Sequence, residues 1–305
     1  MGGDPGRYLS DEVRARIARL DLAAQGLVEG PLTGLHKSPY QGFSVEFAQH
    51  REYTWGDELK HLDWKVFART DRYYVKQYEE ETNLQAHVLL DASESMAYQG
   101  SRALCGKYEY AATLTAGLCF LFLRQQDALG LSLFAEEEEG SLPPSAHPAQ
   151  LRRVCELMAG AEVRAESGHA PIFARFAERP LRRGIVFVIS DLLFPSEGFL
   201  AGLRRLRTCG HEVVVYHVLD PDEVDFPFDE ATLFEGLEAG PELLTDPRAL
   251  RDAYLARMRA FQEQLEEGCR GMRVDYVYAA TNLSPGVALA RYLTQRKRRG
   301  RRARG

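Results

Sequence analysis

The chain has 305 residues, 45% hydrophobic and 27% charged, which is typical of a globular protein with one large or two small domains. Its net charge of -6 hides an asymmetry, because residues 291–305 carry only basic charges and the rest is correspondingly more acidic. We find no segment of signal-peptide type and no apolar run long enough to span a bilayer, so we expect a cytoplasmic protein with no membrane contact.

Residues 1–84 are rich in turns, aromatic side chains and charges. A helix is predicted over 10–22, because Ser10 is a suitable N-cap and Val13, Ile17 and Leu20 share one helical face. Residues 73–78 have β character. We therefore expect an N-terminal helix and a β-rich extension over residues 1–84.

From residue 85 onwards, apolar strands alternate with amphipathic helices. Uninterrupted apolar runs predict strands at 86–91, 129–134, 185–190, 213–218 and 274–279. Helical spacing predicts helices at 108–123, 148–158, 199–206, 247–268 and 285–293, and a hairpin is expected within 232–245. Strands without polar alternation are buried on both faces, so residues 85–295 are predicted to form an α/β domain with a doubly wound, mostly parallel sheet.

Two charged segments lie beside these elements. The basic residues 296–305 could bind nucleic acid or an acidic partner through charge, but no aromatic side chain is interleaved for base stacking. A disordered, solvated tail and no nucleic-acid partner are therefore expected. The acidic run 136–139 is expected at a solvated hairpin tip.

A D-x-S-x-S pattern follows the first core strand directly. Alternate residues of an extended or turning segment point the same way, so Asp91, Ser93 and Ser95 can converge on one point. A carboxylate and two hydroxyls supply the oxygen ligands that Mg²⁺ prefers. The alternative is that the three residues cap the helix that follows the turn.

Asp191 supports the metal interpretation, because it follows the predicted strand 185–190. Ligands of doubly wound sheets sit beyond the carboxyl ends of the strands, near a switch in strand order. The sequence therefore predicts a metal site formed by Asp91, Ser93, Ser95 and Asp191.

The chain also resembles a known family through motifs that occur in order over nearly its whole length. They are residues 36–42 (HKSPYQG), 44–47 (SVEF), 51–53 (REY), 62–65 (LDWK), 68–72 (ARTDR), 76–83 (KQYEEETN) and 90–96 (LDASESM). This set resembles the bacterial domain-of-unknown-function 58 family, whose members carry a von Willebrand factor A-like domain.

The resemblance implies a protein-binding or scaffolding module rather than an enzyme. It further implies work with a MoxR-type AAA+ ATPase in the assembly or maturation of other complexes, and a metal-ion-dependent adhesion site at the four residues above. Family members with a full site add a Thr where this chain has Ala170, so a Mg²⁺ ligand is expected to be missing. Ser167 or His169 could substitute for it.

A hydrolase or phosphotransferase with Asp91 as nucleophile is the alternative function, because aspartyl-phosphate enzymes also place an Asp after the first strand of a doubly wound sheet. The dehalogenase pattern requires a second Asp two residues later, where this chain has Ser93, and no G-x-x-x-x-G-K-[ST] loop is present. His217, inside an apolar strand, is expected to be a core histidine with satisfied hydrogen bonds.

Overall fold

The computed structural model describes residues 45–52, 64–70, 72–80, 84–135, 137–161, 163, 170–179, 181–229, 232–234, 243–245 and 247–302. The predicted helix at 10–22, and the candidate ligands Ser167 and His169, lie outside these residues. The chain divides into two compact units, of which residues 38–84 form the smaller.

The smaller unit contains an antiparallel strand pair and one short helix. Strand β1 (Val45–Glu52) pairs with β2 (Tyr74–Glu80), and the register shifts between Phe47 and Gln49. Helix α2 (Trp64–Thr70) carries Phe67, whose ring stacks on that of Tyr73 with 4.5 Å between centroids. Strand β2 confirms the β character predicted for residues 73–78.

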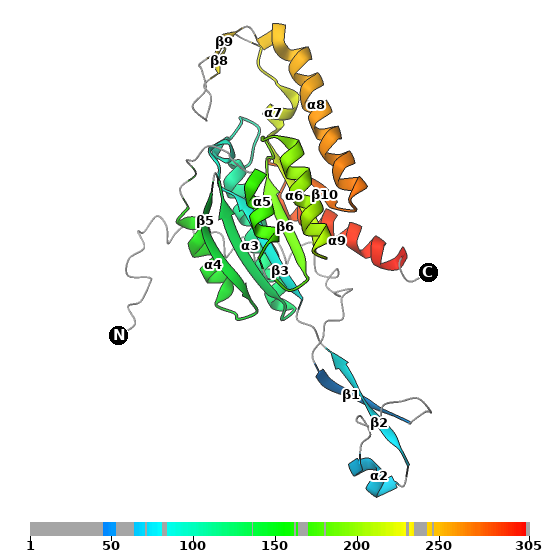
Figure 1. Ribbon diagram of the computed structural model, residues 1–305. Coiled ribbons are helices and arrows are strands. Elements are labelled where there is room, and N and C mark those ends of the chain that lie inside the picture. The colour runs from blue at the N-terminus through cyan, green and yellow to red at the C-terminus, as the bar shows by residue number, and fades with distance from the viewer. Residues whose placement is uncertain are drawn as a thin grey trace, which may run out of the picture. The chain divides into compact units, whose positions relative to one another are not determined.

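The larger unit is built on a six-stranded sheet with the order β10-β7-β6-β3-β4-β5 (Figure 1). Its members are β3 (Gln85–Asp91), β4 (Ala128–Phe134), β5 (Glu138–Ser145), β6 (Ile185–Ser190), β7 (Glu212–Leu219) and β10 (Asp275–Ala280). All neighbouring strands are parallel except β4 and β5, which form an antiparallel hairpin at one edge. The predicted doubly wound, mostly parallel sheet is confirmed.

Strand β5 was not predicted as a strand, because its sequence contains Pro143 and Pro144. Proline cannot donate to the hydrogen-bond ladder and is tolerated mainly on edge strands, and β5 occupies the edge. The acidic residues around Glu138 lie where β4 turns into β5.

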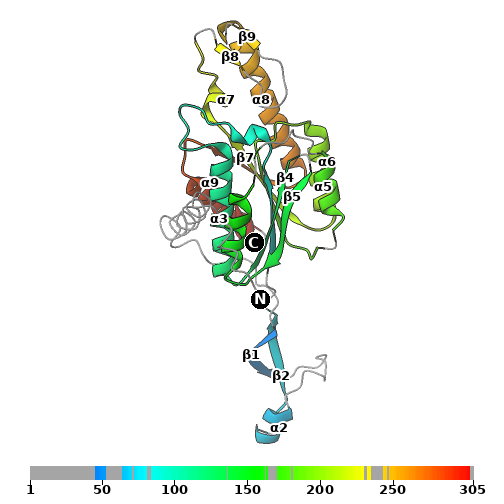
Figure 2. The same ribbon diagram turned by 90° about the vertical axis from the view of Figure 1, so that its left-hand side faces the viewer.

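Helices cover both faces of the sheet (Figure 2). One face carries α3 (Lys107–Arg124), α4 (Gln150–Ala159) and α9 (Pro285–Arg302), which contact one another or the sheet. The other carries α5 (Ala170–Ala177), α6 (Ser196–Thr208) and α8 (Pro247–Gly271). Two short elements, the 3₁₀ helix η3 (Glu94–Ala97) and α7 (Pro221–Asp225), follow the carboxyl ends of β3 and β7.

Two apolar layers hold the helices to the sheet. On the α5–α6–α8 side, Phe173, Phe199 and Leu265 pack with valines of β6 and β7 in one buried cluster. On the α3–α9 side, the ring of Phe187 meets those of Phe122 and Tyr292 edge to face. This aromatic packing holds α3 and α9 against β6.

Three segments differ from the sequence-based expectation or extend it. Helix α5, which begins at Ala170, was not predicted because eight residues give too short a periodic pattern. Helix α9 continues to Arg302, into the basic segment for which a disordered tail was expected; Lys and Arg are good helix formers and suit the negative end of a helix. Strands β8 (Thr232–Phe234) and β9 (Leu243–Thr245) pair antiparallel, which confirms the hairpin within 232–245.

Within the described part of the chain, none of the helices combines the length and apolar character needed to cross a lipid bilayer.

Candidate functional site

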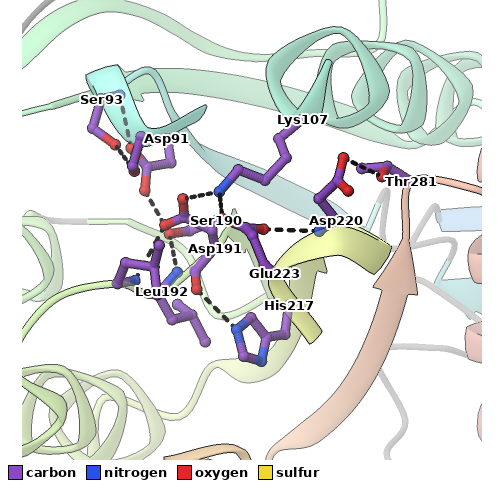
Figure 3. A network of polar contacts seen from close by, with 12 residues as sticks. Asp91, Ser93, Lys107, Ser190, Asp191, Leu192, His217, Asp220, Glu223 and Thr281 are labelled. Atoms are coloured by element: carbon purple, nitrogen blue, oxygen red, sulfur yellow. Dashed lines mark hydrogen bonds and ion pairs between the residues drawn. The ribbon is translucent and has the colours of Figure 1, made fainter. Parts of the chain in front are cut away.

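The predicted site residues lie at the switch point of the sheet. Strand β3 has β4 on one side and β6 on the other, and all three are parallel. The carboxyl end of β3 delivers Asp91, and the neighbouring end of β6 delivers Ser190 and then Asp191 (Figure 3). This is the place where doubly wound sheets bind ligands.

Asp91 joins the two strand ends. Its Oδ1 accepts a hydrogen bond from the backbone N–H of Ser93 at 2.9 Å, and its Oδ2 accepts one from the Ser190 hydroxyl at 2.5 Å. The Asp91 side chain is fully buried. Both of its oxygens therefore serve to hold the turn after β3 against the end of β6.

The two serines of the pattern contact each other, and Ser95 links them to Asp191. The hydroxyl oxygens of Ser93 and Ser95 are 3.1 Å apart, and Ser95 hydrogen-bonds the Asp191 carboxylate. Ser93 occupies the N-cap position of η3, but its side chain makes no capping hydrogen bond. The structure thus brings Asp91, Ser93, Ser95 and Asp191 into one network.

Lys107, which the sequence did not single out, occupies the centre of this network (Figure 3). Its Nζ donates to Asp191 Oδ2 at 2.8 Å and to Glu223 Oε1 at 2.6 Å, and lies 5.7 Å from the ring centroid of Tyr98. The lysine side chain is fully buried although it is the first residue of α3. Its position just before a predicted helix was visible in the sequence, but its burial was not.

The charges of this cluster stabilise one another. Burial alone would lower the pKa of Lys107, but the carboxylates of Asp191 and Glu223 outweigh it and raise that pKa. Burial would raise the pKa of Asp191, yet the adjacent ammonium lowers it. For Glu223, burial prevails over the ammonium, and the pKa is raised. Lys107 and Asp191 therefore form a buried ion pair.

A second set of carboxylates adjoins the first at the start of α7. Asp220 and Glu223 form a capping box, in which Asp220 also accepts hydrogen bonds from the Gly100 N–H at 2.9 Å and the Thr281 hydroxyl at 3.1 Å. Asp222 accepts from the Ser101 N–H at 2.7 Å. The loop between η3 and α3 is thereby clamped to the ends of β7 and β10.

His217 hydrogen-bonds the backbone carbonyl of Asp191. Because a carbonyl oxygen can only accept, the 2.8 Å contact with the Asp191 carbonyl makes Nε2 the protonated nitrogen, and Nδ1 then accepts from the Tyr276 hydroxyl. Burial lowers the pKa of His217 to about 4. The prediction of a satisfied core histidine is confirmed.

The turn after β6 holds an unusual backbone conformation. Leu192 has φ of 56°, in the left-handed region that costs a branched side chain about 1 kcal/mol or more. The Ser190 hydroxyl accepts from the Leu192 N–H at 2.8 Å, and Asp191 Oδ1 accepts from the Leu193 N–H at 3.1 Å. These bonds keep Leu192 buried and turn Leu193 outward, 40% exposed.

Leu193 is one of several large apolar side chains that are exposed in the segments following the carboxyl ends of the strands. Leu104 is 65% exposed, and its N–H donates to the carbonyl of Thr281 just after β10; Leu283, two residues further, is 38% exposed. We refer to Leu104, Leu193 and Leu283, with the half-buried Ser95, as the carboxyl-edge surface.

A pocket of about 740 Å³ opens beside Leu193, between the turn after β6 and helix α8. Its lining comprises Leu193, Phe194, Pro195, Ser196, Tyr254, Arg257, Met258, Ala260, Phe261 and Gln264. The apolar character of the carboxyl-edge surface therefore extends into a concave region.

The charges around Asp191 oppose a bound Mg²⁺ ion. A metal bound to Asp191 Oδ2 would lie about 2 Å from that oxygen, so the Lys107 ammonium would be within about 5 Å of it. Unit charges 4 Å apart interact by about 4 kcal/mol at an effective dielectric constant of about 20, so a divalent ion would be repelled by several kcal/mol. Lys107 thus cancels the attraction of Asp191.

Few other donors compensate for that loss. Both oxygens of Asp91 already accept hydrogen bonds, and α5 begins at Ala170, which has no hydroxyl. Within the residues that the structure describes, no group of three or more His, Cys, Asp or Glu side chains is arranged to hold a metal. The four predicted ligands converge, but together with Lys107 they do not fit a resident Mg²⁺ ion.

Comparison with known proteins gives a family match. Residues 49–264, more than half of the chain, match the profile of the protein family of unknown function DUF58. An uncharacterised protein of Mycobacterium tuberculosis, Rv1480, and one of Mycobacterium bovis, Mb1516, are each 28% identical over 297 residues, covering 94% of this chain and 90% of the relative.

Two solved structures are similar at low sequence identity. The conserved hypothetical protein BatB from Bacteroides thetaiotaomicron is 16% identical, with a TM-score of 0.46 over 70% of this chain and 98% of that chain. The VWA domain of SpRpn10 is 12% identical, with a TM-score of 0.39 over 68% of this chain and 94% of that chain.

Proposed function

The chain belongs to the DUF58 family, with a von Willebrand factor A-like α/β domain, and from that premise we propose that it is a non-enzymatic protein-binding module. The binding region is the carboxyl-edge surface, in the segments that follow the carboxyl ends of the strands. Its partner is a protein that supplies apolar side chains and a hydrogen-bonding group for Ser95.

One observation carries this proposal: Leu193 and Leu104 are exposed in segments whose backbone is held by hydrogen bonds. Leu193 and Leu104 expose 40% and 65% of their surface, although the backbone N–H of each is hydrogen-bonded, to the Asp191 carboxylate and to the Thr281 carbonyl. Large apolar side chains that remain exposed at one end of a fold are candidates for contact with a partner protein. A turn that is already ordered also reduces the entropy cost of binding.

The surroundings of Asp91 favour binding over catalysis. A nucleophilic carboxylate must reach its substrate, but Asp91 is fully buried and both oxygens accept hydrogen bonds from the turn and from Ser190. These contacts support a structural role for Asp91 and place the alternative hydrolase or phosphotransferase second.

As the partner we propose a MoxR-type AAA+ ATPase, with which the protein assists assembly or maturation of other complexes. Support for this choice comes from the family resemblance in the sequence motifs. The carboxyl-edge surface is compatible with it, because it is ordered, partly apolar and adjoins a pocket of about 740 Å³ that can receive a side chain.

The proposal is tested by capturing the purified MoxR-type ATPase of the same organism on the immobilised protein. Leu193→Asp and Leu104→Asp are expected to reduce capture at least tenfold, because central apolar contacts dominate interface energies. Gln125→Asp is the matched control, since Gln125 is exposed at the opposite end of α3. Equal capture by all three variants would refute the proposed surface.

The enzymatic alternative has its own test. Phosphoester turnover is screened with the wild type and Asp91→Asn, a variant that retains the size of the side chain. We expect no turnover in either protein. Turnover in the wild type that disappears in Asp91→Asn would replace the binding proposal by the enzymatic one.

A further inference from the structure

We propose that Lys107 is the permanent cation of the switch-point site and takes the place that a divalent metal would occupy between the D-x-S-x-S turn and Asp191. The inference deepens the proposed function: partner binding at the carboxyl-edge surface requires no metal. It concerns the polar network itself, so its test does not depend on the partner.

The contacts of the ammonium group are the first support. A lysine ammonium has three protons to donate, and two go to carboxylates of different segments, Asp191 after β6 at 2.8 Å and Glu223 in α7 at 2.6 Å. The third side of the group faces the ring of Tyr98, 5.7 Å from its centroid. The ammonium thus bridges the loops after β6 and β7 as a bound metal ion would.

The position of Lys107 in the chain is the second support. It is the first residue of α3, and its backbone N–H donates to the carbonyl of Tyr98 at 3.0 Å. The side chain is fully buried and so cannot leave the network without opening the loop. The N-terminal end of α3 carries partial positive charge, which adds to the charge of the ammonium and further disfavours a metal cation at this place.

Other cations and acids nearby are already paired. Arg102 binds Asp222 at 2.6 Å and Asp225 at 2.9 Å, while Asp220 accepts hydrogen bonds from Gly100 and Thr281. Asp91 is occupied by Ser93 and Ser190. Among these carboxylates, Asp191 and Glu223 are the ones that Lys107 neutralises.

The first experiment measures metal binding by the wild type. Mn²⁺ is titrated and followed through water-proton relaxation, with Mg²⁺ as competitor. We expect no site with a Kd below about 1 mM that depends on Asp191. Binding of one Mn²⁺ that Mg²⁺ displaces and Asp191→Asn abolishes would overturn the inference; binding that persists in Asp191→Asn lies elsewhere and agrees with it.

The second experiment removes the ammonium while retaining the stem of the side chain. In Lys107→Met the two carboxylates lose their cation, so Mg²⁺ at about 100 times its Kd should raise the Tm by roughly 5–10 °C. Lys107→Arg, which keeps the positive charge, and the wild type should show no such rise. A folded Lys107→Met protein whose Tm ignores Mg²⁺ would contradict the inference.

If Lys107→Met does not fold, the Mn²⁺ titration of the wild type still shows whether a metal binds at Asp191. Neither experiment includes the ATPase, so failure of the proposed surface and failure of this inference are distinguishable. Loss of capture in Leu193→Asp tests the first, and metal binding tests the second.

Discussion

At the scale of single residues, the buried ion pair of Lys107 with Asp191 should be much more important than ion pairs on the surface. Both groups are almost fully buried, so removing the ammonium leaves a carboxylate without its partner. We expect Lys107→Met to lower the free energy of unfolding by about 3–5 kcal/mol, measured by urea denaturation.

The matched control is the exposed pair of Arg205 and Glu178, which has the same 2.8 Å separation. Arg205→Ala should cost less than about 1 kcal/mol, because water screens that pair. In the double variant Lys107→Met/Asp191→Asn, part of the loss should be recovered. Equal effects of the buried and the exposed substitutions would contradict this account of the network.

The sequence predicted some of these residues and not others, for a physical reason. Asp91, Ser93 and Ser95 are close in the chain, and Asp191 follows a recognisable apolar strand, so their convergence could be predicted. Lys107 meets Asp191 across 84 residues and Glu223 across 116. Such contacts depend on how the loops after three strands pack, and no local pattern shows them.

At the scale of elements, two buried histidines within strands should make stability depend on pH. Burial lowers the pKa of His87 in β3 to about 3 and that of His217 in β7 to about 4. The unfolded chain binds these protons near pH 6.5, so the stabilisation is complete above that pH and declines as the pH falls toward 4. Each histidine should account for about 2 kcal/mol between pH 7 and pH 5.

Urea denaturation at pH 7 and pH 5 tests this expectation, with His87→Gln as the comparison. The variant should lose about 2 kcal/mol of the change, the share expected from His87. Glu223, whose pKa burial raises, acts in the opposite direction in both proteins, so the comparison isolates His87. An identical pH dependence in wild type and variant would show that His87 is not responsible.

The loop between η3 and α3 gives an element-scale prediction about the clamp at α7. A Cβ at Gly100 would collide with the carboxylates of Asp220 and Asp222, so Gly100→Ala must displace one of the segments. We expect a loss of about 1–3 kcal/mol and faster amide hydrogen exchange at residues 98–106.

Gly271, the last residue of α8, is the control for that substitution. Nothing lies within 4 Å of a Cβ placed there, so Gly271→Ala should be neutral or stabilise by up to about 1 kcal/mol. Unchanged exchange at residues 98–106 in Gly100→Ala would mean that the clamp tolerates the extra methyl group.

Among the elements, buried strands were the most predictable and edge or terminal segments the least. The run 185–190 coincides with β6, because a strand buried on both faces is apolar throughout. Strand β5 was obscured by its prolines, and α9 extended beyond the predicted end because charged residues have no apolar periodicity to mark a boundary. The inner part of α9, which packs against α3, is the part that the helical spacing over 285–293 predicted.

At the scale of the whole domain, the strand order β10-β7-β6-β3-β4-β5 explains why the site lies where it does. The alternation of strands and helices predicted a parallel sheet, and the sheet in turn predicted a ligand site beyond its carboxyl ends. The exposed leucines of the carboxyl-edge surface could not be predicted. Whether a leucine in a loop is buried or exposed depends on the conformation of the turn, which the sequence does not show.

A hydrogen-exchange footprint would show whether the protein binds its partner through the carboxyl-edge surface. Amide exchange of the protein is compared with and without the MoxR-type ATPase. We expect protection at residues 98–106, 191–196 and 281–287, around Leu104, Leu193 and Leu283. Protection confined to residues 45–80, with exchange at those three segments unchanged, would contradict it.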